Sequence, residues 1–133
     1  MTLVEVVFAL GISVLMVAGI VSSYIYGTAA AIKAELAQAA NAKALERIEQ
    51  ARSVQWDPTT WQGVDNLVAS NFPDEVVTLD MPGTNAVGTT ATVQTTIAQL
   101  SVTPPLRSIH VDCIWQFRGG ELITNSIETI RAP

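Results

Sequence analysis

The chain has 133 residues, of which 49% are hydrophobic and 14% are charged, and 7 basic residues stand against 12 acidic ones. This acidic balance cannot supply the positive surface that binds phosphates, so we expect no nucleic-acid partner. One cysteine, Cys113, and one histidine, His110, are too few for a structural zinc site, a disulfide framework or a Cys/His catalytic pair. We therefore expect no cofactor, no metal and no enzymatic activity.

The N-terminal part carries a long uncharged segment. Glu5 is the only charged residue before Lys33, and residues 6–32 contain no Asp, Glu, Lys, Arg or His. A helix over these positions would be about 40 Å long at ~1.5 Å per residue, enough to cross a hydrocarbon core of about 30 Å. The charges up to residue 52 sum to zero, so the net charge of -5 lies wholly in the acidic remainder of the chain.

One helix is predicted from about residue 2 to about residue 53. No proline occurs before Pro58, and residues 29–51 are dominated by strong helix formers. We divide this helix into a hydrophobic membrane or filament-core segment, residues 1–32, and an amphipathic segment, residues 33–53. Residues 54–133 are predicted to form a separate globular head.

The amphipathic segment is predicted to pack on that head. Its apolar residues recur three to five positions apart, whereas Lys33, Glu35 and Arg47 belong to the other faces. The apolar set is Ile32, Leu36, Ala40, Leu45 and Ile48. We assign Leu45 and Ile48 to the core of the head.

Three glycines, Gly11, Gly19 and Gly27, recur every eight residues in the hydrophobic segment. They are typical of membrane helices, but they also suit a face where helices pack closely, together with Phe8 and Leu15, or a site of local unwinding. A cleaved secretory signal and a plain single-span anchor are the competing interpretations of the segment. The first lacks a basic n-region and has too long an apolar run, and the second leaves Glu5 unexplained.

Glu5 is the informative residue of this segment. A carboxylate inside a membrane-entering helix costs roughly 2.5 to 3.5 kcal/mol unless it finds a partner or reaches the interface. The nearest cation in the chain is the α-amino group of Met1, and a neighbouring copy's amine is equally reachable. The helix N-terminus also favours a negative group by about 0.3 to 1 kcal/mol.

The head begins with a turn-forming stretch that contains Trp56, Pro58 and Trp61, and the proline ends the helix. We expect the tryptophans to cap a small core, a glycan or partner site being the alternative. Residues 64–92 are predicted to be a variable loop in which only residues 76–79 are strand-like. Its acidic residues Asp74, Glu75 and Asp80 match no calcium loop, which favours solvated charge over a Ca²⁺ site.

Two strands with period-2 alternation follow, over residues 92–103 and from about residue 109 onward. A three-residue loop, Arg118-Gly119-Gly120, sets Trp115 opposite Ile123 and Val111 opposite Ile127, so that apolar residues share a face. We assign these four residues and Cys113 to the core, and His110 to the surface. The predicted fold is α+β, a long N-terminal helix on a three- to four-stranded antiparallel sheet.

The first ten residues, Met-Thr-Leu-Val-Glu-Val-Val-Phe-Ala-Leu, resemble the mature N-terminus of type IV pilins and type II secretion pseudopilins. The resemblance covers residues 1–53. Residues 44–52 and the C-terminal hairpin are more loosely similar to the minor pseudopilin I and pilus-modification group. The chain departs from the family pattern in having Met at position 1, where Phe is common, and in lacking the proline of many major pilins, for which Gly19 could substitute.

The resemblance implies a structural subunit that polymerises through its N-terminal helix into an extracellular pilus-like filament. A minor tip pseudopilin, or a minor pilin that primes assembly, is the alternative. It further implies that Glu5 pairs with the Met1 amine of an adjacent subunit, that this amine is N-methylated, and that no leader remains. The implied partners are further copies, other pilin-like subunits, the prepilin peptidase and the assembly machinery. The implied location is the bacterial inner membrane before assembly and the cell surface afterwards.

Overall fold

The computed structural model describes residues 2–58, 63–80 and 88–133. The chain divides into two compact units, Met1–Glu35 and Leu36–Pro133. We call the second unit the head. It includes residues 36–53, the outer segment of the long helix.

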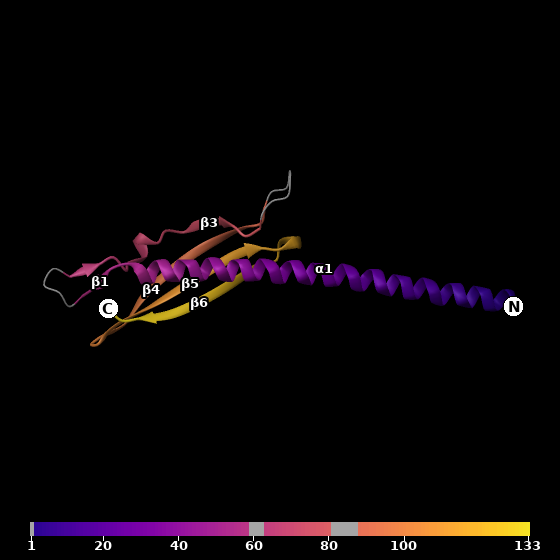
Figure 1. The fold of residues 1–133 in the computed structure, drawn as a ribbon, viewed down its shortest axis with the longest axis horizontal. Coiled ribbons are helices and arrows are strands. Elements are labelled where there is room, and N and C mark those ends of the chain that lie inside the picture. The colour runs from indigo at the N-terminus through magenta and orange to yellow at the C-terminus, as the bar shows by residue number, and fades with distance from the viewer. Residues whose placement is uncertain (1, 59–62, 81–87) are drawn as a thin grey trace. The chain divides into compact units, whose positions relative to one another are not determined.

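Helix α1 runs from Leu3 to Ser53, close to the predicted bounds, and no proline interrupts it (Figure 1). Its end is capped from the last strand of the head. The guanidinium of Arg131 donates to the carbonyl oxygens of Ala51 (2.8 Å) and Val54 (2.7 Å). These carbonyls lack helical partners at a C-terminus, and a cation there also complements the helix dipole.

The head contains a four-stranded antiparallel sheet in the order β3-β4-β5-β6. A two-stranded ribbon and two short 3-10 turns, Ala69–Asn71 and Arg118–Gly120, complete the elements found in the described residues. The α+β class and the long N-terminal helix agree with the prediction. The four strands of the main sheet are β3 (Glu75–Thr78), β4 (Thr90–Val102), β5 (Pro105–Gln116) and β6 (Leu122–Arg131); the ribbon pairs β1 (Trp56–Asp57) with β2 (Val64–Asp65).

The register of the β5-β6 hairpin is the predicted one. Trp115 lies opposite Ile123 and Val111 opposite Ile127. The N–H of Phe117 donates to the carbonyl of Glu121 (2.8 Å) and closes the turn. Gly119 inside the turn has φ of 82°, a conformation that only glycine adopts without strain.

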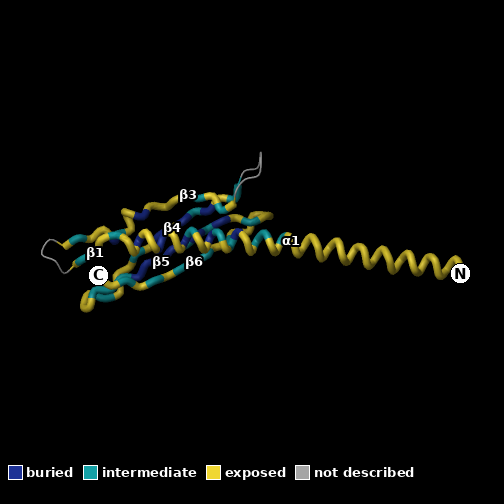
Figure 2. Tube along the Cα trace, viewed as in Figure 1, coloured by how far each residue is buried: buried dark blue, intermediate teal, exposed yellow. Residues whose placement is uncertain are grey.

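The core lies between the outer segment of α1 and one face of the sheet (Figure 2). Ile48, Val111, Cys113 and Trp115 are buried as predicted. Ile123 and Ile127 are only half-buried, because β6 is an edge strand of the sheet and has a neighbouring strand, β5, on one side only. Leu36 and Ala40 of the predicted docking face are also buried, as is Trp56, which was expected to cap the core; Trp61 lies outside the described residues. The other buried apolar residues are Ala44, Ala51, Leu67, Phe72, Ala91, Val93 and Ile109.

The assignment of Leu45 to the core is wrong, since its side chain is 50% exposed. The buried residues of α1 are Leu36, Ala40, Ala44, Arg47, Ile48 and Ala51. At about 100° per residue these form one stripe, and Leu45 lies about 120° from its centre. Alanine occupies three of the six positions, which lets the helix backbone approach the sheet closely. Small side-chain size therefore decides which residues of α1 face the sheet as much as hydrophobicity does.

Polar side chains also connect the outer segment to the sheet. Asn125 accepts a hydrogen bond from the indole N–H of Trp115 (2.8 Å) and donates to Asn41 of α1 (3.1 Å). Arg52 of α1 donates to Thr129 of β6 (3.0 Å). The Trp115 indole N–H is buried and must be paired, and these contacts together fix the rotation of the helix on the sheet.

Candidate functional site

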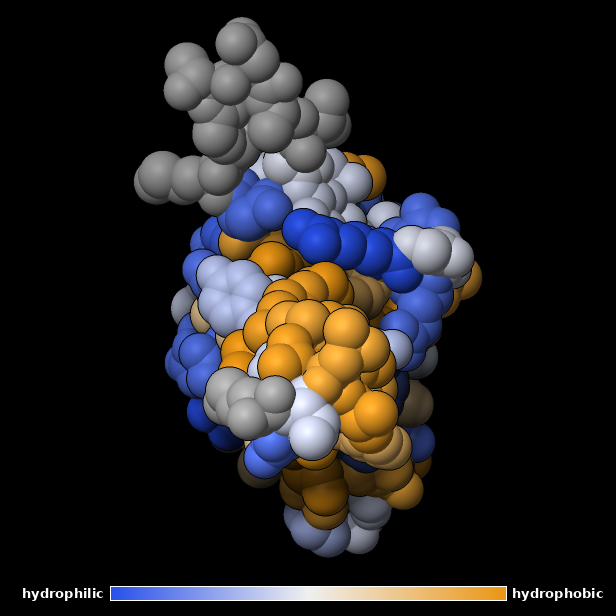
Figure 3. Space-filling view, turned by 90° about the vertical axis from the view of Figure 1, so that its right-hand side faces the viewer, coloured by the Kyte–Doolittle hydropathy of each residue, from blue (hydrophilic) through white to orange (hydrophobic). Residues whose placement is uncertain are grey.

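The N-terminal segment of α1 has no buried residue from Thr2 to Thr28. Among the described residues α1 is long and apolar enough to cross a membrane by length and composition. Figure 3 views the chain from its N-terminal end, where apolar residues gather in the middle of the view. Phe8 is 69% and Leu15 74% exposed. An all-apolar helix of this kind is stable only in lipid or among other helices.

Glu5 takes part in the cap of its own helix. Its backbone N–H lies 3.4 Å from Thr2 Oγ1, and its carboxylate Oε2 lies 3.4 Å from the Thr2 N–H. Since α1 begins at Leu3, Thr2 is the N-cap and Glu5 the third helical residue, which is the reciprocal arrangement of a capping box. Sequence reasoning missed this local role, although the Thr-x-x-Glu spacing would have predicted it.

The capping distances are long, so the cap engages the Glu5 carboxylate weakly. A second, stronger charge partner for that carboxylate is therefore compatible with the geometry. The predicted partner, the amine of Met1, lies outside the described residues. The pairing between them stays a prediction.

Hydroxyl groups in the apolar segment bond to the helix itself. Ser13 Oγ donates to the carbonyl of Ala9 (2.8 Å) and Thr28 Oγ1 to that of Ile25 (3.0 Å). Such bonds remove the cost of placing a hydroxyl in hydrocarbon. Tyr24 and Tyr26 are more than 70% exposed near the end of the segment, a position typical of residues at a membrane interface.

The three glycines of the segment have no packing partner within the chain. A Cβ placed on Gly11, Gly19 or Gly27 would meet nothing within 4 Å. Nothing inside the described chain therefore requires glycine there. The choice between a packing face, local unwinding and ordinary composition depends on what surrounds the helix.

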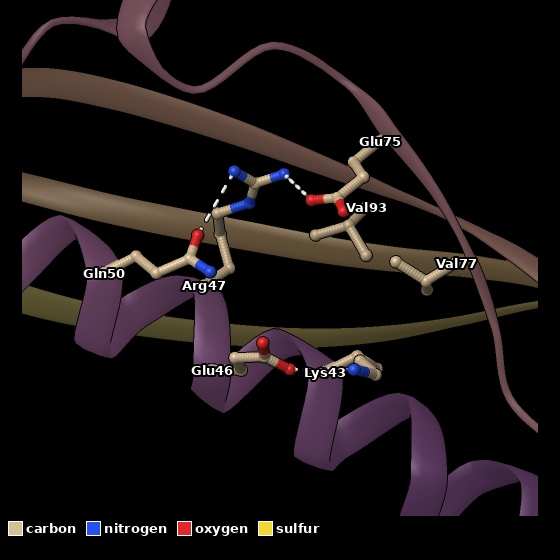
Figure 4. Close-up of a pocket in the computed structure, with 7 residues that line it drawn as sticks. All are labelled: Lys43, Glu46, Arg47, Gln50, Glu75, Val77 and Val93. Atoms are coloured by element: carbon tan, nitrogen blue, oxygen red, sulfur yellow. Dashed lines mark hydrogen bonds and ion pairs between the residues drawn. The ribbon is translucent and has the colours of Figure 1, made fainter.

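In the head, a small cavity of about 30 Å³ lies between α1 and β3, enough for about one water molecule (Figure 4). Arg47 is buried there, although the sequence placed it on another face. It donates to Glu75 (2.7 Å) and to the carbonyl of Pro73 (3.3 Å). Lys43 and Glu46 form an exposed pair at 2.8 Å, whose hydrogen bond raises the pKa of Lys43 and lowers the pKa of Glu46.

A second arginine, Arg107 of β5, connects the sheet to the ribbon β1-β2. It donates to both carboxylate oxygens of Asp65 (2.6 Å each) and to the carbonyl of Leu67, and its guanidinium lies 4.9 Å from the Trp56 ring centre. The hydrogen bond from Arg107 lowers the pKa of Asp65, and the same contact raises the pKa of Arg107. Through these contacts the Arg107 guanidinium holds the ribbon β1-β2 against the sheet, which is a structural role.

The remaining reactive side chains form no catalytic arrangement in the described residues. Asp112 accepts hydrogen bonds from both Ser126 and His110 (3.1 Å to His110), so the carboxylate lies between the hydroxyl and the imidazole. A catalytic triad requires the imidazole in the middle. Cys113 is buried, and burial raises the pKa of its thiol, which disfavours the reactive thiolate.

The acidic residues considered for calcium do not converge on one point. Asp74 accepts a hydrogen bond from Gln94 (3.0 Å), Glu75 is paired with Arg47, and Asp80 accepts from Thr89. Within residues 2–58, 63–80 and 88–133, no three His, Cys, Asp or Glu side chains are grouped to hold a metal ion.

The candidate functional site is therefore the exposed N-terminal segment of α1 with Glu5 at its beginning. Comparison of the chain with family models, curated proteins and solved structures gave no match.

Proposed function

We propose that this protein is a structural subunit that polymerises through its apolar N-terminal helix into a filament of the type IV pilus or type II secretion pseudopilus class. The observation that carries the proposal is the division of α1. Its N-terminal segment has no buried residue through position 28, whereas its outer segment belongs to the core of a folded head. A filament core of packed helices, or lipid before assembly, would cover the exposed segment.

Glu5 supports this proposal over a plain membrane anchor. A plain anchor gains only a weak helix cap from this carboxylate, whereas a subunit that must find its neighbour also gains a charge that recognises the neighbour's N-terminal amine. When both charges leave water together, a missing partner is penalised by several kcal/mol. Under this proposal the amine is N-methylated by the prepilin peptidase, and the protein moves from the inner membrane to the cell surface.

The test uses the capping box to separate two roles of Glu5. Glu5→Gln keeps the capping hydrogen bond, since Gln serves at that position, but removes the charge. Glu5→Ala removes both, and Thr2→Ala keeps the charge but removes the capping hydrogen bond that Thr2 Oγ1 accepts. We expect filaments sheared from cells of the source organism and counted by negative-stain microscopy to be lost in Glu5→Gln and Glu5→Ala, and to persist in Thr2→Ala.

Membrane insertion must be unchanged in all three variants, which cell fractionation checks. Normal filaments from inserted Glu5→Gln would contradict the charge pairing. Absence of filaments built from the unsubstituted chain would contradict the proposed function. N-terminal peptide mass spectrometry of sheared fibres provides a second test, with a methylated Met1 amine as the expected result.

A further inference from the structure

The two outer strands of the head present unpaired backbone groups. In the described residues β3 and β6 are the edges of the sheet, and no strand pairs with the outer side of either one. The closing bond from the Phe117 N–H to Glu121 shows that odd-numbered residues of β6 bond to β5. Because antiparallel bonding alternates, even-numbered residues turn their N–H and C=O groups outward. On β6 these are Leu122, Thr124, Ser126, Glu128 and Ile130.

The same parity holds at the other edge. The N–H of Leu79 donates to the carbonyl of Thr89 (2.9 Å), in register with the pair Val77 and Ala91. Val76 and Thr78 of β3 therefore direct their backbone groups outward. Val76 is 70% exposed and Ile130 of β6 is 61% exposed, so each edge carries an exposed apolar side chain.

Strand β6 lacks the features that normally protect an edge. It is ten residues long, its pairing with β5 has no bulge, and it contains neither proline nor lysine. The one register shift in the sheet lies between Gln99 and Ser101 of β4, away from this edge. A long, regular edge of this kind is a template for an additional strand.

The even number of strands in the sheet determines which strand of a second copy can pair with the edge of β6. Neighbouring strands alternate in direction, so β3 and β6 of one head run antiparallel to each other. When two heads have the same orientation, β6 of one can therefore pair antiparallel with β3 of the next. Pairing two β6 strands antiparallel would instead reverse one head, and with it the outer segment of its helix. Only the first arrangement is compatible with subunits that all insert from one membrane.

We propose that β6 of one subunit receives β3 of a second, identically oriented copy, which extends the sheet from head to head. The inference rests on the proposed function, because that function requires the common orientation. It adds a contact between heads to the contact between helices. Such a contact is heterologous, with different surfaces on the two copies, and it therefore continues along a filament.

The register follows from the side chains. Four registers keep all of the second copy's β3 within β6 and maintain the outward hydrogen-bonding parity. One of them sets Ile130 opposite the second copy's Val76 and Arg131 opposite its Glu75. In the other three, Val76 faces Thr124, Ser126 or Glu128. The proposed register is the one that pairs apolar with apolar, since Arg131 and Glu75 are already bound to α1 within each head.

Disulfide trapping tests this register in the full chain. In an Ile130→Cys, Val76→Cys double variant, the two cysteines of one subunit lie on opposite edges of the sheet, three strand spacings of about 4.8 Å apart or more. A disulfide bridges Cα atoms no more than about 7 Å apart, so any bond between them joins two subunits. Filaments that are oxidised and then run on a non-reducing gel should give a ladder of dimers, trimers and larger species, which reduction collapses to monomer.

The controls distinguish the alternatives. Each single variant should give no ladder beyond a dimer, and a Thr124→Cys, Val76→Cys pair should remain uncross-linked because it traps a different register. A Leu122→Cys, Ile130→Cys pair reports antiparallel pairing of two β6 strands.

Filaments of the Ile130→Cys, Val76→Cys variant that stay monomeric on the gel would overturn the proposed contact and leave the helix-mediated filament standing. A ladder from the Thr124 pair, or a cross-linked dimer from the Leu122 pair, would overturn it in favour of the other register or of β6-to-β6 pairing. A chain that builds no filament even without substitution would instead contradict the proposed function.

Discussion

The two parts of α1 have opposite relations to the rest of the chain. Over residues 2–28 every side chain is exposed although the sequence is almost entirely apolar, whereas the outer segment has charges on its surface and still buries six residues. The outer segment thus obtains its stability from the head. The N-terminal segment must obtain it from lipid or from other chains. One unbroken helix can therefore have two parts that are stabilised by different partners.

The largest effect is expected from removing residues 1–28, which separates the exposed apolar segment of α1 from the head. The remaining chain should be water-soluble, folded and monomeric, because it keeps every buried residue of the head and, with Glu5 removed, still has 11 acidic residues against 7 basic ones, a net charge of -4. The full chain should require detergent or lipid. Sedimentation with and without detergent, together with circular dichroism, checks both. A truncated head that aggregates would show that the head needs the apolar segment to fold.

Within the truncated head, Ile48→Asp should abolish folding and Leu45→Asp should not. Ile48 is 2% exposed, and an unpaired charge at that position costs several kcal/mol against a total stability of about 5 to 15 kcal/mol. Leu45 is half exposed, so its replacement should change stability by only about 0.5 kcal/mol. Thermal melts of the two variants measure the difference. Equal melting of Ile48→Asp and its parent would refute the burial of the outer segment.

Replacing Arg47 with Met should have an intermediate effect. The substitution removes the donor to Glu75 and to the Pro73 carbonyl, but Glu75 is 57% exposed and stays hydrated when left alone. We expect a loss of about 1 to 2 kcal/mol. The matched control is Lys43→Met, whose exposed ion pair with Glu46 is worth about 0 to 1 kcal/mol. Urea unfolding of both variants gives the comparison, and equal losses would mean that burial of Arg47 adds nothing.

The smallest expected effect is a pH dependence at Asp65. The hydrogen bond from Arg107 lowers the pKa of Asp65 in the folded state, so the pair stabilises the head above the ordinary carboxyl value of 3.8. That contribution should be lost as the pH falls from about 4 through the lower folded pKa. Asp65→Asn should be less stable at neutral pH and should show a shallower decline of its melting temperature below pH 4. Parallel curves for variant and parent would contradict the role of the pair.

Much of the architecture was predictable from local patterns. The helix bounds follow from the absence of proline before Pro58 and from strong helix formers, and the hairpin register follows from the rule that apolar side chains must share one face. The exposure of the N-terminal segment follows from its composition. The capping role of Glu5 also follows from the Thr-x-x-Glu spacing.

Other features required the tertiary structure. The contact stripe of α1 uses Ala40, Ala44 and Ala51, which let the helix approach the sheet closely, whereas Leu45 lies on another side of the helix and is half exposed. The burial of Arg47 depends on Glu75, 28 residues away, and the cap of α1 on Arg131, nearly 80 residues beyond its end. Periodicity and propensity act within a few residues of the chain, and they determined the elements. Which arginine is buried, which alanines touch the sheet and which strand edges remain open were decided only when distant segments packed together, because each depends on the size and charge of a partner that no local pattern contains.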